Sequence, residues 1–246
     1  MPFDLSLGTS AFLALALLGA AYVRGYSGFG FSAIFIASSA LVTNPLPLIP
    51  VVFACEMLMT VFQARGIRGH IDWRRVFALL GGAAIALPFS VSFILSVGTE
   101  TARLAVSVIV LVMSLILLTG WTIQRRIAVP GHVGVGVVSG ICNSAGVGGL
   151  PVAAFMTAQP MAAATFRATM IVYLTGLDFI TMPFLWHGGL IGWETLQGLA
   201  LAFPILGLGI WLGSRRFSAT SPDGFRRFAI FLLLTLAILG LVRAAM

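Results

Sequence analysis

Four ionisable side chains stand inside long apolar stretches of this sequence: the acids Glu56 and Asp178 and the arginines Arg24 and Arg167. Glu56 is at the centre of VVFACEMLMTVFQ, and Asp178 follows about 122 positions later in VYLTGLDFITMPF. A carboxylate placed in hydrocarbon costs roughly 2.5–3.5 kcal/mol on insertion scales, so each acid needs a reason to be there. One reason is proton coupling, in which the acid is neutral in a dry environment and ionised in a wet one. The other is an ion pair with Arg24 or Arg167, and the sequence leaves both interpretations open.

The two arginines are candidates for binding an anion. The planar guanidinium group bonds two oxygens of an oxyanion at once and stays charged when it is buried. Arg24 precedes a glycine-rich break and can coordinate an anion from a re-entrant helix hairpin; alternatively it lies in a short cytoplasmic loop between two full spans. Arg167 is five residues into its apolar span, so its side chain can instead extend to the membrane surface.

Glycine-rich breaks occur at matching places in the two halves of the chain. In GYSGFGFSAIFIA and SAGVGGLPVAAFM, Gly28 and Gly30 align with Gly146 and Gly148, and Gly149 follows. A helix N-terminus at such a break offers free N–H groups to an anion. Irregular backbone at membrane depth is tolerated only where it faces protein or a watery cavity. The alternative is that these glycines only let helices pack closely.

A few polar residues surround the second break. Asn143, Ser144 and Gln159 are candidates for lining an anion path, although each can also simply bond across helices. The three histidines lie near the ends of apolar spans without metal-ligand spacing, and no nucleotide-binding motif is present. We therefore expect no catalytic residues, no metal site, no cofactor and no enzymatic activity.

The composition indicates an integral membrane protein. Of 246 residues, 59% are hydrophobic and only 9% are charged, against about 25% charged in soluble domains. The mean hydropathy is +1.08. The net charge of +7 comes from fourteen arginines that fall between apolar spans, which favours orientation in a lipid bilayer over binding of nucleic acid.

The periodicity predicts an all-α polytopic fold with ten helical spans: 9–23, 31–43, 47–64, 76–97, 102–122, 133–145, 147–158, 162–185, 194–213 and 227–244. The four short spans form two glycine-broken, re-entrant or fully spanning pairs; the other six are full crossings. Ile71 and Trp73 match Ile191 and Trp193, 120 positions further on. We expect two repeats within one membrane domain, 1–122 and 131–246, joined by a basic cytoplasmic linker at 123–130.

The arginines predict that the two repeats have opposite orientations. Segment 65–75 holds four arginines and its counterpart 186–193 holds none, whereas 97–103 holds one and its counterpart 214–227 holds four. Because positive loops face the cytoplasm, equivalent loops lie on opposite sides of the membrane. This arrangement is an inverted repeat, which is typical of secondary transporters.

The sequence resembles the TauE/SafE family of sulfite and organosulfonate exporters, also called the toluene-sulfonate uptake permease family. The resemblance rests on the chain length, the two halves and the glycine motifs; GVGGLPVAAF fits the family motif well, whereas GFGFSAIFIA has Phe31 and Ser32 where further glycines are common. It implies a multi-pass protein of a bacterial inner membrane that moves a small sulfur-containing anion. We expect export, and the buried acids Glu56 and Asp178, rather than the resemblance, are the reason to expect proton coupling. A passive anion channel, a non-sulfur organic anion and a homodimeric assembly remain open alternatives.

Overall fold

The computed structural model describes residue 3, residues 5–119, 122–123 and 127–217, and residues 231, 234 and 238. These residues form helices joined by short turns, and no strand occurs among them, so the predicted all-α class is confirmed. The helices are α1 (Leu7–Ser27), α2 (Phe31–Val42), the short η2 (Leu46–Leu48), α3 (Ile49–Ile67), α4 (Trp73–Ser96), α5 (Thr99–Leu118), α6 (Val129–Asn143), α7 (Gly149–Thr157), α8 (Ala163–His187) and α9 (Trp193–Phe217).

Five helices in the described part of the chain are long and apolar enough to cross a membrane: α1, α3 together with η2, α4, α8 and α9. Large apolar side chains such as Phe89 and Trp211 are exposed on their outer faces, as expected where lipid replaces water. The chain is therefore a multi-pass membrane protein. Most of the predicted span 227–244 and most of the predicted loop 214–227 lie outside the described residues.

The first helix differs from its prediction. A short span at 9–23 was expected, but α1 has 21 residues and continues through Arg24 and Gly25 to Ser27. Gly25 does not break the helix. Its lack of a side chain instead allows α9 to pack closely, since a Cβ atom there would lie 2.8 Å from the carbonyl oxygen of Ile210 in α9. The turn comes instead at Gly28, whose φ of 82° belongs to the left-handed region.

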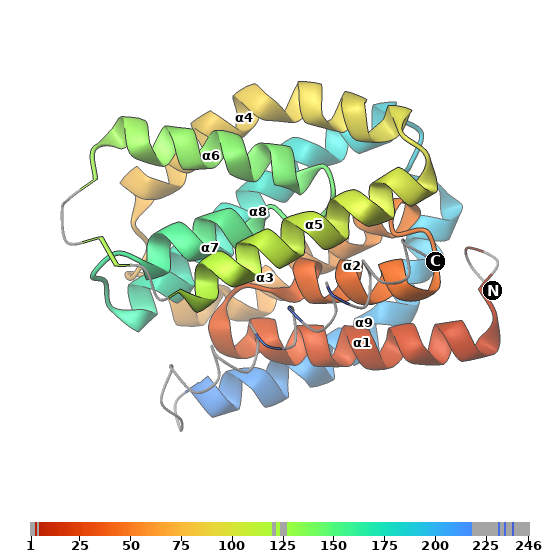
Figure 1. The fold of residues 1–246 in the computed structure, drawn as a ribbon. Coiled ribbons are helices and arrows are strands. Elements are labelled where there is room, and N and C mark those ends of the chain that lie inside the picture. Colours follow the sequence, from red (N-terminus) through yellow and green to blue (C-terminus); the bar gives the residue numbers. More distant parts are fainter. Residues whose placement is uncertain are drawn as a thin grey trace.

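Two helix hairpins, α1–α2 and α6–α7, point in opposite directions. In Figure 1, α1 runs away from the end of the molecule that holds the N-terminus, and α2 runs back towards it. Helix α6 starts at the other end, and α7 returns there. Both α2 and α7 are buried along nearly their whole length, which explains why they are apolar on all sides.

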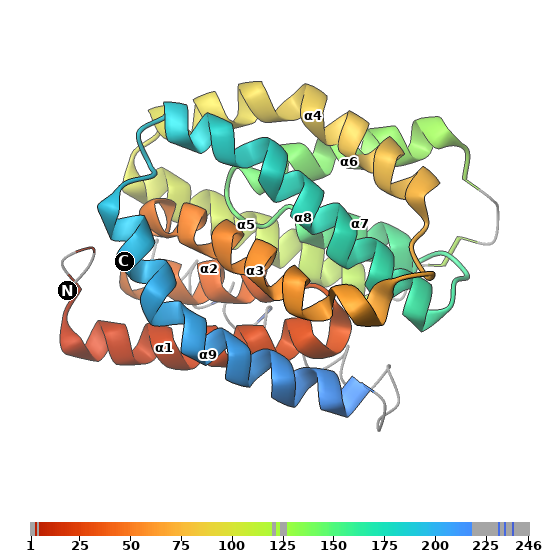
Figure 2. The same cartoon turned by 180° about the vertical axis from the view of Figure 1, so that it is seen from behind.

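The first helix of each hairpin packs on a helix of the other half of the chain through direct backbone contact. Helix α1 packs on α9, and α4 packs on α6 (Figure 1 and Figure 2). In the second pair, a Cβ atom at Gly136 would collide with the backbone of Leu79, and one at Gly140 would lie 2.7 Å from the carbonyl oxygen of Ala83. In each pair a serine hydroxyl also donates to a glycine carbonyl oxygen of the partner helix. Ser90 of α4 donates to Gly140 of α6 at 3.1 Å, and Ser214 of α9 donates to Gly25 of α1. Glycine thus brings these helices together without intervening side chains.

Candidate functional site

A buried ion pair joins the end of α1 to the middle of α3. Nη1 of Arg24 lies 3.1 Å from Oε1 of Glu56, and the two side chains are 0% and 1% exposed. A buried charge is tolerated only when it is paired and hydrogen-bonded, which each of these residues provides for the other. The sequence left this pairing open for Glu56, and the structure contains it. The alternative that put Arg24 in a cytoplasmic loop is wrong, because the residue is helical and buried.

Two threonines extend this pair to α8. Nη2 of Arg24 donates to Thr60 Oγ1 at 3.3 Å, and Thr60 Oγ1 lies 2.6 Å from Thr175 Oγ1. Sequence reasoning missed both hydroxyls. The signal was their helical spacing from the acids, since Thr60 is four residues after Glu56 and Thr175 is three residues before Asp178, on the same helix face in each case.

Asp178 brings a second carboxyl group to the same place. It is 1% exposed, and neither of its oxygens makes a hydrogen bond of ordinary geometry within the described chain, although it is near enough to interact electrostatically with Glu56 and Arg24. The site thus holds one cation and two carboxyl groups. Were both carboxyl groups ionised, the three groups would carry one uncompensated negative charge, which a low-dielectric interior disfavours.

Arg167 lies close to this group but has different partners. Its Nη2 donates to the carbonyl oxygen of Gly25 at 2.8 Å and approaches Oγ of Ser214 at 3.4 Å. The contact places a cation on the last turn of α1, where the helix dipole is negative. Arg167 and Arg24 are close enough for their charges to interact. The structure therefore brings both arginines to the region of the α1–α2 turn.

The glycine motifs form two separate turns. Gly28, Gly30 and Gly146 have φ values of 82°, 89° and 76°, which few other residues adopt. Gly148 instead has an ordinary φ of −60° and is glycine for lack of space, since a Cβ atom would lie 2.6 Å from Oδ1 of Asn143. Gly149 is the first residue of α7.

The two turns have different neighbours. Gly28 lies against Arg167 of α8, where a Cβ atom would be 2.8 Å from Cγ. Gly146 lies against Ile36 of α2 and Ile49 of α3. The two turns thus contact different helices, whereas Arg24, Glu56 and Asp178 come together at the buried ion pair.

The polar residues near the second turn do not form one cluster. Asn143 Nδ2 donates to Thr181 Oγ1 of α8 at 2.9 Å, and Ser144 bonds to the carbonyl oxygen of Ile141. Gln159 lies beyond the opposite end of α7, where its Nε2 donates to the carbonyl oxygen of Phe155. Asn143 is thus bonded across helices, and Gln159 belongs to another part of the molecule.

Sequence reasoning also missed a chain of hydrogen bonds that holds the second turn. Tyr173 Oη of α8 donates to Ser139 Oγ of α6 at 2.7 Å, and Ser139 donates to the carbonyl oxygen of Gly148 at 2.5 Å. Both side chains are fully buried. This chain fixes the position of the α6–α7 turn against α8, as the ion pair fixes α1 against α3.

The chain is similar to one known protein family over nearly its whole length. The family model described as Sulfite exporter TauE/SafE matches residues 12–240, nearly the whole chain. Neither the curated proteins nor the solved structures gave a match. The matched family consists of membrane transporters and not of enzymes. The chain therefore belongs to the TauE/SafE family of membrane transporters.

Proposed function

We propose that this protein is a secondary transporter that exports a small sulfur-containing anion, such as sulfite or a sulfonate, across a bacterial inner membrane. The observation that carries the proposal is the buried group of Arg24, Glu56 and Asp178, in a chain whose family is described as a sulfite exporter. An apolar wall cannot hold an oxyanion, because a buried anion needs cations or hydrogen-bond donors. Arg24 is such a cation.

In the proposed mechanism the anion and Glu56 compete for Arg24. In the structure, which we take as the closed state of the site, the Glu56 carboxylate accepts a hydrogen bond from Nη1 of the Arg24 guanidinium group. An arriving oxyanion bonds to the same group through two oxygens. Glu56 cannot remain ionised beside the anion, since like charges repel strongly in a low dielectric. Glu56 or Asp178 therefore takes up a proton as the anion binds, and this exchange couples the two movements.

Thr60 and Thr175 assist this exchange. Their hydroxyl groups lie 2.6 Å apart, and either can rotate to donate to an oxygen of the bound anion. Arg167 adds a second positive charge near the α1–α2 turn. It need not touch the anion in order to raise the local potential.

The glycine turns are proposed to open the path to this site. Helices α2 and α7 both begin without a side-chain cap at Gly30 and Gly148. The first N–H groups of α2 are therefore available to a passing anion. At the start of α7 the N–H of Leu150 bonds to the carbonyl oxygen of Val147 and Pro151 has no N–H, so only Gly149 is proposed to offer its N–H there. Asn143, Ser144, Gly146 and Gly149 complete the second turn in this role.

Two repeats of opposite orientation, 1–122 and 131–246, would supply the alternating access that a transporter needs. Three observations support this division. Helix α1 packs on α9 as α6 packs on α4, so equivalent helices have equivalent partners in the other half. The two hairpins point to opposite ends (Figure 1). Arginine-rich and arginine-poor loops exchange places between the halves.

The test is anion flux into proteoliposomes that contain the purified protein, with and without a pH gradient. The anions are sulfite, sulfate, thiosulfate, a small sulfonate and acetate. We expect saturable sulfite or sulfonate flux that the pH gradient drives, and slow flux of acetate. Absence of flux for every sulfur anion would overturn the transporter proposal.

Glu56→Gln separates coupled transport from a passive pathway. This variant should lose the response to the pH gradient, whereas Glu100→Gln, which makes the same change at an exposed acid, should keep it. If Glu56→Gln and the parent protein respond equally, the coupling role of Glu56 is wrong and a passive facilitator is the better description.

A further inference from the structure

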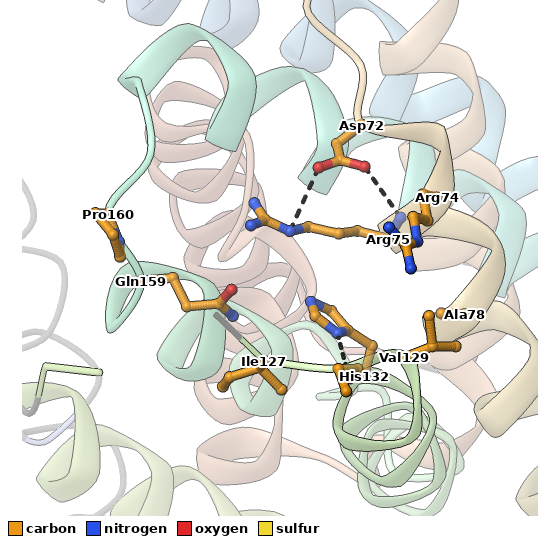
Figure 3. A pocket seen from close by; sticks show the side chains of 10 residues that line it. Asp72, Arg74, Arg75, Ala78, Ile127, Val129, His132, Gln159 and Pro160 are labelled. Atoms are coloured by element: carbon orange, nitrogen blue, oxygen red, sulfur yellow. Dashed lines mark hydrogen bonds and ion pairs between the residues drawn. The ribbon is translucent and has the colours of Figure 1, made fainter. Parts of the chain in front are cut away.

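A pocket of about 740 Å³ opens at the end of the molecule where α4 and α6 begin (Figure 3). It lies between the first turns of these helices and the segment that follows α7, and none of the residues that line it belongs to the buried ion pair. Its polar lining consists of Asp72, Arg74, Arg75, His132 and Gln159. The volume falls in the range of about 300–1,000 Å³ that is usual for small-molecule sites.

The pocket carries a net positive charge. Asp72 caps α4 and pairs with Arg75, whose Nε lies 3.4 Å from Oδ2 of Asp72. Arg74 is exposed and forms no ion pair within the described part of the chain. One cation therefore remains unbalanced at the mouth of the pocket.

His132 supplies an unused polar atom deeper in the same pocket. The residue is 5% exposed, and its Nδ1 lies 3.2 Å from the carbonyl oxygen of Ala128, so Nδ1 carries a proton and donates it. Nε2 is buried and has no hydrogen-bond partner among the described residues. Figure 3 shows the ring pointing into the space between Arg75 and Gln159. A buried ring nitrogen without a partner indicates a ligand that completes its bonding.

A second pocket lies at the equivalent place in the other half, and its charge is reversed. It has a volume of about 240 Å³ and is lined by Thr43, Asn44 and Glu194 together with apolar residues, with no arginine or histidine among the described residues that line it. Glu194 stands 120 positions after Arg74, the same offset that aligns the flanking tryptophans. The two ends of the proposed pathway thus present opposite charges to an anion.

We propose that the pocket around Arg74 and His132 is a loading site for the transported sulfur oxyanion, and that the pocket around Glu194 is a low-affinity release site. This inference rests on the proposed function. The anion bonds to Arg74 and to Nε2 of His132, with the proton between Nε2 and the anion coming from the anion itself or from the solution. At the other end the Glu194 carboxylate repels the same anion. The asymmetry does not set the direction of net flux, which depends on the gradients. It sets the concentration at which each end becomes half-saturated.

The experiment measures the half-saturation concentration for sulfite separately at each end, in proteoliposomes whose orientation has been determined. Arg74→Gln should raise this concentration roughly tenfold at the end where α4 begins, because a charge-assisted hydrogen bond is lost. His132→Asn, which keeps a donor at the position of Nδ1 and removes Nε2, should raise it about threefold. The maximal flux and the half-saturation at the other end should not change. Glu194→Arg should lower the half-saturation concentration at its own end.

Arg68→Gln is the matched control, because it removes an exposed arginine at the same end but outside the pocket. An equal effect of Arg68→Gln would mean that general surface charge is responsible, and the proposal would be overturned. Sulfite titrations in phosphate-free detergent test whether the pocket instead binds lipid phosphate: if Arg74→Gln alters phospholipid retention and leaves sulfite affinity unchanged, the loading site is wrong. Sulfite flux in the parent protein with unaffected variants would overturn this inference alone, whereas absence of any flux would overturn the proposed function.

Discussion

Glu56→Gln should destabilise the protein because it removes the carboxylate that pairs directly with the buried Arg24 charge. The two side chains are 0% and 1% exposed, so water cannot replace the lost carboxylate. Removing one partner of a buried ion pair typically costs about 3–5 kcal/mol. Because the glutamine oxygen can still accept a hydrogen bond from Nη1, we expect the lower end of this range.

A loss of about 3 kcal/mol corresponds to a fall in apparent Tm of about 6–12 °C, at about 2–4 °C per kcal/mol for a chain of this size. The measurement is thermal unfolding of the purified variant in detergent. A double-mutant cycle isolates the pair: Arg24→Met combined with Glu56→Gln should be more stable than either single variant, since the double variant contains no unpaired charge.

Additive losses in the double variant would refute this reasoning. They would show that Arg24 and Glu56 contribute independently and that the 3.1 Å contact does not couple them. An unchanged Tm for Glu56→Gln would refute it as well. Either result would remove the ion pair as the closed state of the proposed site.

Three further predictions follow from contacts described above. Asp178→Asn removes an acid that forms no ion pair within the described ranges, so its Tm should stay within about 2 °C of the parent protein, while its flux should lose part of the pH response. A fall in Tm as large as that of Glu56→Gln would contradict the distinction between the two acids. Gly136→Ala should lower Tm strongly because the new methyl group meets the α4 backbone, whereas Gly134→Ala on the same helix meets open space and should be neutral or stabilising by up to about 1 kcal/mol; similar Tm values for the two would refute the close α4–α6 contact. In a cysteine-free background, His70→Cys should be labelled by an impermeant reagent from the cytoplasmic side only and His187→Cys from the outside only; labelling of both from one side would exclude the inverted repeat.

The sequence predicted the features that depend on composition and local pattern. Long apolar stretches identified the membrane-spanning helices, since a helix of about 20 apolar residues is the local solution to crossing hydrocarbon. Glu56 and Asp178 were recognisable because an acid in such a stretch is costly. The structure places both in one buried group with Arg24, one of the two partners expected for them.

Features that depend on packing could not be read from the pattern. The predicted span 9–23 ended before Gly25 because glycine disfavours helices, yet Gly25 is helical and lies in close contact with α9. Thr60 and Thr175 looked like ordinary membrane residues, since only the approach of α3 to α8 brings their hydroxyl groups together. Gln159 was grouped with Asn143 by sequence proximity, although the length of α7 separates them.

The pairing of α1 with α9 has a consequence for the synthesis of the chain. Gly209 and Gly213 of α9 pack directly on Ala21 and Tyr22 of α1, but they are translated almost 190 residues later. At about 5–20 residues per second, the ribosome needs roughly 10–40 s to cover that distance. During this interval the first helix has left the ribosome without the partner that covers its glycine face. When the first half of the chain has been synthesised, α1 therefore still lacks its packing partner. A nascent chain that stops before α9 leaves this face of α1 exposed to the quality-control proteases of the membrane.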